Sequence, residues 1–392
     1  MGAQLASSPL VWRTMSLFPR NSAPLRLIAV SFCALCICHC LFAQKAGEEE
    51  KPQVLEVAPE APDAVKVELS RFGFLQLAPE NRGLLSRQVE ESMKNLRRSL
   101  RKRRPVRITA WVGGAGDARR VSSSIRELLD KWHIPIPAIS VIRVGALPDR
   151  AARVVFDVEV EEDDPVNPHG LLFLAGVRTL APEFRFDIHR ELTDSLDTLE
   201  SRLHEDGGAV ADVISARCFV SLTQDLPALE GVVRKRFPKA NIRVVQSVRS
   251  SPDSYANCDL VARLANAPDR PLDAKVITPV NGEPPITSSV KTNARTLVLS
   301  SAQLGFRATD ADFALAFERL EGTLKAAGSS LANAAQLSIL AASQEVGRRA
   351  EAEGRSYLNA KHDPAILRVT VEGHPALDAT LSLDAIAIVQ SP

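Results

Sequence analysis

Hydrophobic residues in this chain follow two spacings, one typical of helices and one typical of strands. Between residues 188 and 203 apolar side chains recur every three or four positions, which predicts an amphipathic helix that ends at Gly207-Gly208. Residues 214–220 alternate in the manner of a strand. The same succession of strand, helix, strand, helix, strand and strand occurs three times along the chain. The pattern therefore predicts three copies of one structural unit.

The three copies can be followed segment by segment. In the first, strands, helices and closing strands are predicted at 65–69, 72–77, 89–100, 107–112, 121–132, 139–144 and 153–160. In the second they are predicted at 171–174, 188–203, 214–220, 226–237, 242–248 and 258–264. In the third they are predicted at 296–299, 313–324, 336–340, 344–358, 367–371 and 381–389. An amphipathic helix must bury its apolar side, so both helices of a copy are expected on one face of its sheet. The bare sheet faces are then expected to pack against one another.

Residues 1–44 differ from the rest of the chain. They contain three arginines, no acidic residue and an apolar run over 27–43, a composition typical of a secretory signal peptide. The run is short for a membrane-spanning helix, so an uncleaved anchor is the alternative, and translation could start at Met1 or Met15. The prediction is an extracytoplasmic protein, periplasmic or secreted, whose acidic, proline-rich linker covers 45–64.

Composition and net charge limit the classes of protein to which the chain can belong. The chain has 392 residues, 45% of them hydrophobic, and a formal net charge of +1, values that exclude a disordered or collagen-like protein. Without residues 1–44 it keeps 348 residues and a charge of −2, which favours no nucleic-acid partner. The predicted units cover 65–162, 163–268 and 269–392.

Short motifs in the third copy resemble a known family. The residues that carry the resemblance are Leu320-Glu-Gly-Thr-Leu324, Ala326-Ala-Gly-Ser-Ser-Leu331, Pro364-Ala365 and Ser382-Leu-Asp-Ala-Ile-Ala-Ile388, with weaker counterparts in the other copies. They resemble the RidA (YjgF-like) family of enamine/imine deaminases. The resemblance implies an α+β fold made of chorismate-mutase-like units. Because family members are homotrimers with ligand pockets at their interfaces, it also implies an intrachain pseudotrimer that is monomeric in solution.

The family binds a substrate carboxylate through an arginine directly after a Pro-Ala pair. That position holds Ile139, Asn241 or Ile366 in the three copies. Arg243 and Arg368 each lie two positions further along. Residues i and i+2 of a strand share a face, so either arginine could enter the same pocket, and the alternative is a solvent-facing arginine at a sheet edge.

Acidic and hydroxyl residues complete the candidate site. Asp259 and Asp384 lie within apolar closing strands, as does Asp157 in the first copy. The family often has a glutamate there, which implies a catalytic carboxylate that handles protons; a structural, ion-paired acid is the alternative. Ser300 and Ser301 follow the opening strand of the third copy, where they could bind substrate or form a turn.

Two cysteines lie outside the leader. Cys218 and Cys258 fall on strands that are neighbours in the family's sheet order. Export would permit a disulfide between them, and a buried pair of thiols is the alternative. No cofactor is expected, and no metal, because the seven histidines show no close ligand spacing.

The function that the residues favour is that of an exported small-metabolite-binding or scaffold protein without the family's usual arginine. Its expected ligand is a carboxylate or an imino acid. One alternative is an enamine/imine deaminase, a hydrolase that uses a shifted arginine. A second is an RNA- or anion-binding module built on the basic run over 97–107, whose cations could instead complement a helix dipole. A membrane partner is expected only if the leader is uncleaved.

Overall fold

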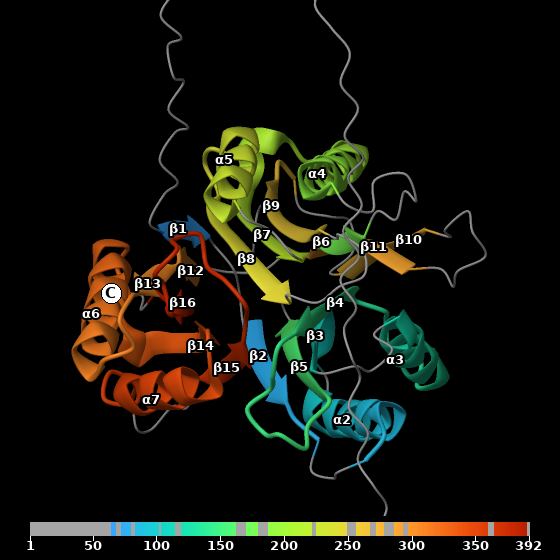
Figure 1. The fold of residues 1–392 in the computed structure, drawn as a ribbon. Coiled ribbons are helices and arrows are strands. Elements are labelled where there is room, and N and C mark those ends of the chain that lie inside the picture. The colour runs from blue at the N-terminus through green and yellow to red at the C-terminus, as the bar shows by residue number, and fades with distance from the viewer. Residues whose placement is uncertain are drawn as a thin grey trace, which may run out of the picture. The chain divides into compact units, whose positions relative to one another are not determined.

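The computed structural model describes residues 64–67, 72–79, 83–101, 103–113, 119–161, 170–178, 187–221, 225–248, 256–266, 272–277, 286–292, 297–359 and 364–389. The predicted leader and all of the predicted linker except residue 64 lie outside these ranges. Within them, no helix has the length and apolar character needed to cross a membrane. The described part is a mixed α+β structure with three sheets and six α-helices (Figure 1).

The first sheet has the strand order β2-β5-β3-β4. Its strands are β2 (Phe72–Leu77), β3 (Arg104–Gly113), β4 (Ala138–Val144) and β5 (Val154–Glu161). Its helices are α2 (Leu85–Leu100) and α3 (Arg119–Lys131). Strands β3 and β4 are parallel and the other pairs are antiparallel.

The second sheet has the order β10-β11-β6-β9-β7-β8. Its strands are β6 (Gly170–Arg178), β7 (Val213–Ser221), β8 (Asn241–Val248), β9 (Ala256–Leu264), β10 (Leu272–Ile277) and β11 (Ile286–Thr292). Its helices are α4 (Ile188–Glu205) and α5 (Leu226–Arg236). The sequence pattern predicted no strand over β10 or β11, and their residues fell within the third unit, which was predicted to begin at residue 269. They instead extend the second sheet, because β11 pairs with β6.

The third sheet has the order β1-β12-β16-β14-β15, with β13 also paired to β16. Its strands are β1 (Ala64–Val67), β12 (Leu297–Ser300), β13 (Gln303–Gly305), β14 (Ala334–Ala341), β15 (Ala365–Thr370) and β16 (Leu381–Ile388). Its helices are α6 (Asp310–Ala326) and α7 (Gln344–Gly354). The sequence pattern assigned β1 to the first unit, but it pairs antiparallel with β12.

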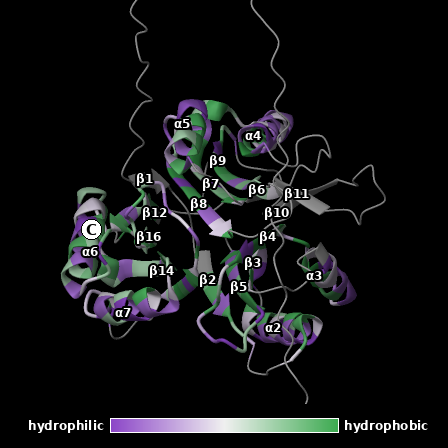
Figure 2. Ribbon diagram, in the orientation of Figure 1, coloured by the Kyte–Doolittle hydropathy of each residue, from purple (hydrophilic) through white to green (hydrophobic). Residues whose placement is uncertain are grey.

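Local sequence signals define the helix ends. Four helices begin at a residue whose side chain accepts a backbone N–H of the first turn: Asp187 for α4, Asp225 for α5, Thr309 for α6 and Ser343 for α7. Gly207 and Gly328, with φ of +81° and +83°, follow α4 and α6, where a left-handed residue commonly ends a helix. Figure 2 shows hydrophobic and hydrophilic positions side by side on these helices, as an amphipathic helix requires.

Each sheet packs one face against its own helices. In the second, Leu192, Leu196 and Leu199 of α4 share a buried cluster with Ala216 and Leu260 of the sheet. Similar clusters join α2 and α3 to the first sheet, and α6 and α7 to the third. The other sheet faces are also buried, which places a second core among the three sheets.

This inner core has an apolar cluster to which all three sheets contribute. Its members include Trp111 and Ile142 of the first sheet, Phe219 and Val245 of the second, and Leu340 and Val369 of the third. The Trp111 and Phe219 rings meet edge to face, with centroids 5.2 Å apart. Backbone hydrogen bonds also join the sheets, such as Thr370 N to Ala146 O at 2.9 Å and Glu372 N to Gln246 O at 2.8 Å. The sheets therefore pack through both side chains and main chain.

Candidate functional site

A polar layer lies next to this apolar cluster on the inner faces of the sheets. Strands β3, β7 and β14 supply Trp111, Phe219 and Leu340 to that cluster. Two positions earlier, each of these strands carries a polar residue that lies opposite an aspartate of the neighbouring antiparallel strand. The opposed pairs are Thr109 and Asp157, Arg217 and Asp259, and Ser338 and Asp384. The three aspartates noted in the sequence therefore occupy corresponding registers in the three sheets.

Arg217 and Asp259 form a two-pronged ion pair. Arg217 Nε donates to Asp259 Oδ1 and Arg217 Nη2 to Oδ2, both at 2.8 Å. The Arg107 guanidinium lies 3.6 Å from the same carboxylate. Burial alone would raise the pKa of Asp259, but the charges of Arg217 and Arg107 outweigh it and the pKa is lowered. This arrangement therefore holds Asp259 in its ionised form.

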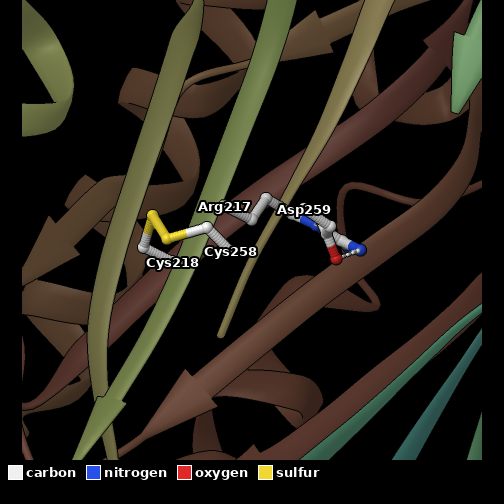
Figure 3. The surroundings of a disulfide bond; sticks show 4 residues. All are labelled: Arg217, Cys218, Cys258 and Asp259. Atoms are coloured by element: carbon white, nitrogen blue, oxygen red, sulfur yellow. Dashed lines mark hydrogen bonds and ion pairs between the residues drawn. A yellow bond between two sulfur atoms is a disulfide. The ribbon is translucent and has the colours of Figure 1, made fainter. Parts of the chain in front are cut away.

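The two cysteines lie on the other face of the same strand pair. Cys218 and Cys258 are directly opposite in register, with Cα atoms 4.1 Å apart, and they form a disulfide. Figure 3 shows the disulfide and the Arg217–Asp259 pair side by side along β7 and β9, with the sulfur atoms and the charged groups pointing in opposite directions. The disulfide belongs to the helix-side core of the second sheet.

Glu159 and Asp157 of the first sheet make further contacts within the polar layer. Glu159 pairs with Arg107, whose guanidinium also lies 5.4 Å from the centroid of the Phe173 ring. Asp157 accepts a hydrogen bond from Gln336 Nε2 of the third sheet at 2.6 Å. The three sheets are therefore linked by side chains: Arg107 reaches from the first to the second, and Gln336 from the third to the first.

A cavity of about 30 Å³ opens in this layer between the second and third sheets. Its lining includes Arg217, Asn241 and Arg243 of the second sheet, Ser301, Gln336, Ser338 and Asp384 from the third-sheet part of the chain, and Arg107 of the first sheet. A volume of this order holds one or two water molecules, whereas pockets for drug-sized ligands span roughly 300–1,000 Å³. The structure therefore shows a small cavity with a polar lining.

Arg243 and Asp384 meet at this cavity from different sheets. They form an ion pair in which the side chains are 7% and 13% exposed. Burial, together with the like charge of Arg217, lowers the pKa of Arg243 to about 9. Arg243 is still a cation at neutral pH, held next to Asp384.

The serines predicted for the site take different roles. Ser300 is buried, and its hydroxyl accepts a hydrogen bond from the backbone N–H of Ala385 at 2.9 Å. Its carbonyl accepts from Asn241 Nδ2 at 2.9 Å. Ser301 is only partly buried and lines the same cavity as Arg243 and Asp384. Ser300 thus fixes the rim of the cavity, while Ser301 belongs to its wall.

Arg368 does not join this group, and the expectation that it shares a face with Arg243 is corrected. In the parallel pair β7–β8, Arg243 lies opposite Arg217. Ser338 is the residue of the third sheet that corresponds to Arg217, and in the parallel pair β14–β15 it lies opposite Leu367. Arg368 is one position further and so points to the helix side. There it packs against Gly347 and lies 3.3 Å from Glu351 of α7. The alignment that matched Asn241 of the second copy with Ile366 of the third was therefore one residue out of register, because Asn241 corresponds to Ala365.

The positions that correspond to Arg243 in the first and third sheets hold other residues. Each lies where its sheet meets the next one. At the first-to-second junction the residue is Ser140, whose hydroxyl accepts from Gly176 N at 3.1 Å. At the third-to-first junction it is Leu367, a member of the inner apolar cluster. Among these three registers, only that of the second-to-third junction holds an arginine.

Side chains of the basic run make contacts within the protein. Arg97 lies over the Trp132 ring at 5.3 Å, Arg103 donates to Ser99 O at 2.6 Å, and Arg104 is 3.8 Å from Glu161. The described residues contain no group of three or more His, Cys, Asp or Glu side chains that could hold a metal ion.

Several cavity residues were not singled out by sequence reasoning. Arg217 and Gln336 are polar positions within otherwise apolar strands, and that interruption was the available signal. Arg107 had been assigned only to the basic run over 97–107. Asn241 was noted only as a departure from the family pattern, although it anchors the cavity rim.

Comparison with solved structures finds partial likenesses. A chorismatase is 10% identical, with 82% of this chain aligned to 99% of that chain at a TM-score of 0.48. A YjgF-family protein from Mycobacterium tuberculosis is 22% identical over 24% of this chain and 79% of its own, at a TM-score of 0.22. E. coli TdcF with bound serine is 21% identical over 24% and 81%, also at 0.22. No protein-family model and no curated protein matches the sequence. At these values the likenesses assign neither a family nor a function to the chain.

Proposed function

We propose that the chain is an intrachain pseudotrimer of three RidA-like units and that its cavity between the second and third sheets binds a small ligand bearing a carboxylate. The observation that carries the proposal is the meeting of Arg243 and Asp384, from different sheets, at a polar cavity. A planar guanidinium that is charged at neutral pH suits a carboxylate ligand. The repeated strand pattern and the family motifs of the third copy support the assignment of the units.

Binding would require the cavity to open. Its present volume is far below that of a metabolite, and Asp384 occupies the position of an anionic partner of Arg243. A ligand carboxylate would replace Asp384 as that partner, so Arg243 would not be left buried without a counter-charge. The displaced Asp384 would then be available to accept a hydrogen bond from the ligand.

Binding can be tested with pyruvate, glycolate, glycine and serine by calorimetry and by thermal shift. We expect at least one of these compounds to bind. Arg243→Met should lower the affinity for that compound at least tenfold, because a buried hydrogen bond to a charged group is lost. Arg368→Met is the matched control, since it removes an arginine from the opposite face of the third sheet. Equal losses in both variants, or none in either, would contradict the assignment of the cavity.

A second candidate function is the hydrolysis of imines to carbonyl compounds and ammonia. The observation that favours it is the carboxylate of Asp384 beside the cation of Arg243 in one cavity. Water would add to the C=N carbon while the nitrogen takes up a proton, after which the C–N bond breaks to give a carbonyl group and ammonia. Asp384 would accept a proton from the water and return one to the nitrogen.

Ammonia release from 2-imino acids generated in situ by an amino-acid oxidase tests this candidate. We expect hydrolysis above background to disappear in Asp384→Asn and to persist in Arg368→Met. If the wild-type protein releases no ammonia above background but binds a carboxylate, the protein is a binding protein without deaminase chemistry.

We also propose that the protein is exported. The leader-like composition of residues 1–44 and the Cys218–Cys258 disulfide support this, because disulfides persist in oxidising compartments. The expected mature protein begins near residue 44 and has no reactive thiol under denaturing, non-reducing conditions. Mass spectrometry of the N-terminus and thiol titration of protein purified from the periplasm or medium would check both points.

A further inference from the structure

Gln336 connects the cavity to a residue of the first sheet. It lines the cavity, and its Nε2 donates to Asp157 Oδ2 at 2.6 Å. An ionised carboxylate can only accept, so the amide of Gln336 must direct its nitrogen toward Asp157. The carbonyl oxygen Oε1 then lies at the other corner of the amide, away from this anchor.

Asn241 is anchored at the cavity in the same sense. Its Nδ2 donates to the backbone carbonyl of Ser300, which also can only accept. Both amides therefore commit an N–H to the protein and leave the carbonyl oxygen as the acceptor that they can offer to a ligand. Together with Asp384, this arrangement suits a ligand that carries N–H donors in addition to its carboxylate.

Asp157 is a buried acid with an incomplete set of partners. It is 5% exposed, and its Oδ1 has no hydrogen-bond partner in the described structure. The charged groups that act on it are Glu159, which disfavours its ionised form, and the cations Arg217, Arg107 and Arg243, which favour it. Burial and the charge of Glu159 prevail and raise its pKa to about 6.

We propose that Asp157 is a positioning residue for the cavity between the second and third sheets: by holding Gln336 Nε2, it directs the Gln336 carbonyl toward a ligand N–H donor. This inference rests on the proposed function for its ligand class, but the contact itself belongs to the fold. When Asp157 takes up a proton, its O–H can donate to Gln336 Oε1, and the amide can turn. The cavity then gains an N–H donor in place of an acceptor, so its preference for ligand N–H groups declines in acid.

The orientation of Gln336 can be followed without any ligand. In full-length mature protein labelled with side-chain ¹⁵N-glutamine, we expect the Gln336 NH₂ resonance, assigned by its loss in Gln336→Glu, to titrate with a midpoint near pH 6. In Asp157→Asn this inflection should vanish while the other glutamine resonances keep their positions. An inflection that survives in Asp157→Asn, or a Gln336 resonance that does not change between pH 4.5 and 8, would overturn the proposal.

Binding separates this proposal from the proposed function. At pH 7.5 the wild-type protein should prefer glycine, which has an ammonium group, over acetate, which has none, and Asp157→Asn should reduce that ratio of affinities at least fivefold. An unchanged ratio would overturn the positioning role. If neither probe binds but the Gln336 resonance titrates as expected, the proposed function fails and the Asp157–Gln336 coupling stands.

Discussion

The buried Arg217–Asp259 pair allows a quantitative test of the inner core. The perturbations are Asp259→Asn, Arg217→Met and the double variant. In Asp259→Asn, Arg217 keeps a long hydrogen bond to Thr109 Oγ1, at 3.4 Å, and the more distant charges of Glu159 and Asp157. In Arg217→Met, Asp259 keeps the Arg107 guanidinium at 3.6 Å. The two single variants should therefore differ in cost.

Breaking one partner of a buried ion pair typically costs about 3–5 kcal/mol, because it leaves an uncompensated charge. Asp259 is 1% exposed and Arg217 12%, so both charges are shielded from water. We expect Asp259→Asn to lie near the upper end of that range and Arg217→Met nearer ~2–3 kcal/mol, because Arg107 compensates in part. The double variant should cost less than the two single costs combined, with a coupling of about 1–3 kcal/mol.

The assay is urea unfolding of the four proteins at pH 7.5, followed by circular dichroism, with Glu345→Gln at an exposed helical position as the control. The difference between wild type and Asp259→Asn should also depend on pH. Because the folded-state pKa of Asp259 is lowered, its stabilisation is present above the usual pKa near 3.9 and lost as pH falls below it. Additive single costs, or a difference that persists unchanged to pH 2.5, would refute the reasoning.

Three further predictions concern neighbouring features. Because the pKa of Asp157 is raised from 3.8 to about 6, its ionisation opposes folding; Asp157→Asn should stabilise the protein by up to ~3 kcal/mol at pH 8, and the gain should disappear toward pH 4 in matched urea titrations. Replacing Cys218 and Cys258 together by Ala and Val should cost about 4 kcal/mol for a 40-residue separation, measured under non-reducing conditions; wild-type stability that is insensitive to dithiothreitol would contradict it. Trp111→Ala should cost about 3–5 kcal/mol by leaving a cavity beside Phe219, and a cost below 1 kcal/mol in thermal or urea unfolding would show that the inner cluster collapses around it.

Local patterns were enough to predict most elements of the fold. The helix over 188–203 and the strand over 214–220 appear at nearly those positions, because side-chain periodicity reports which face of an element is buried. Periodicity does not report pairing partners. The strand at 64–67 was therefore assigned to the first unit, although it pairs with β12. The strands at 272–277 and 286–292 were not predicted, and their residues were placed in the third unit although they extend the second sheet.

The candidate site was predictable in part for the same reason. Arg243, Asp384 and Ser301 line one cavity, and each had been selected from its position in the repeated pattern. Arg368 and Arg243 were expected on one face because the second copy was aligned one residue out of register, and a one-residue shift moves a strand side chain to the other side of its sheet. The contacts of Asp157 with Gln336, and of Arg107 with Asp259, join different sheets, so no periodicity within one copy could indicate them.

The pairing of β1 with β12 has a consequence for how the chain is made. Val67 lies opposite Leu297, a partner 230 residues away, and β12 in turn pairs with β16, close to the end of the chain. On the ribosome, β1 emerges before the other described strands and has no strand to pair with until β12, 230 residues later, has been synthesised. Such long-range pairing is slow to form and leaves a strand edge exposed in the meantime. Assembly of the third sheet is therefore expected to be the last step of folding and the one most open to intermolecular pairing.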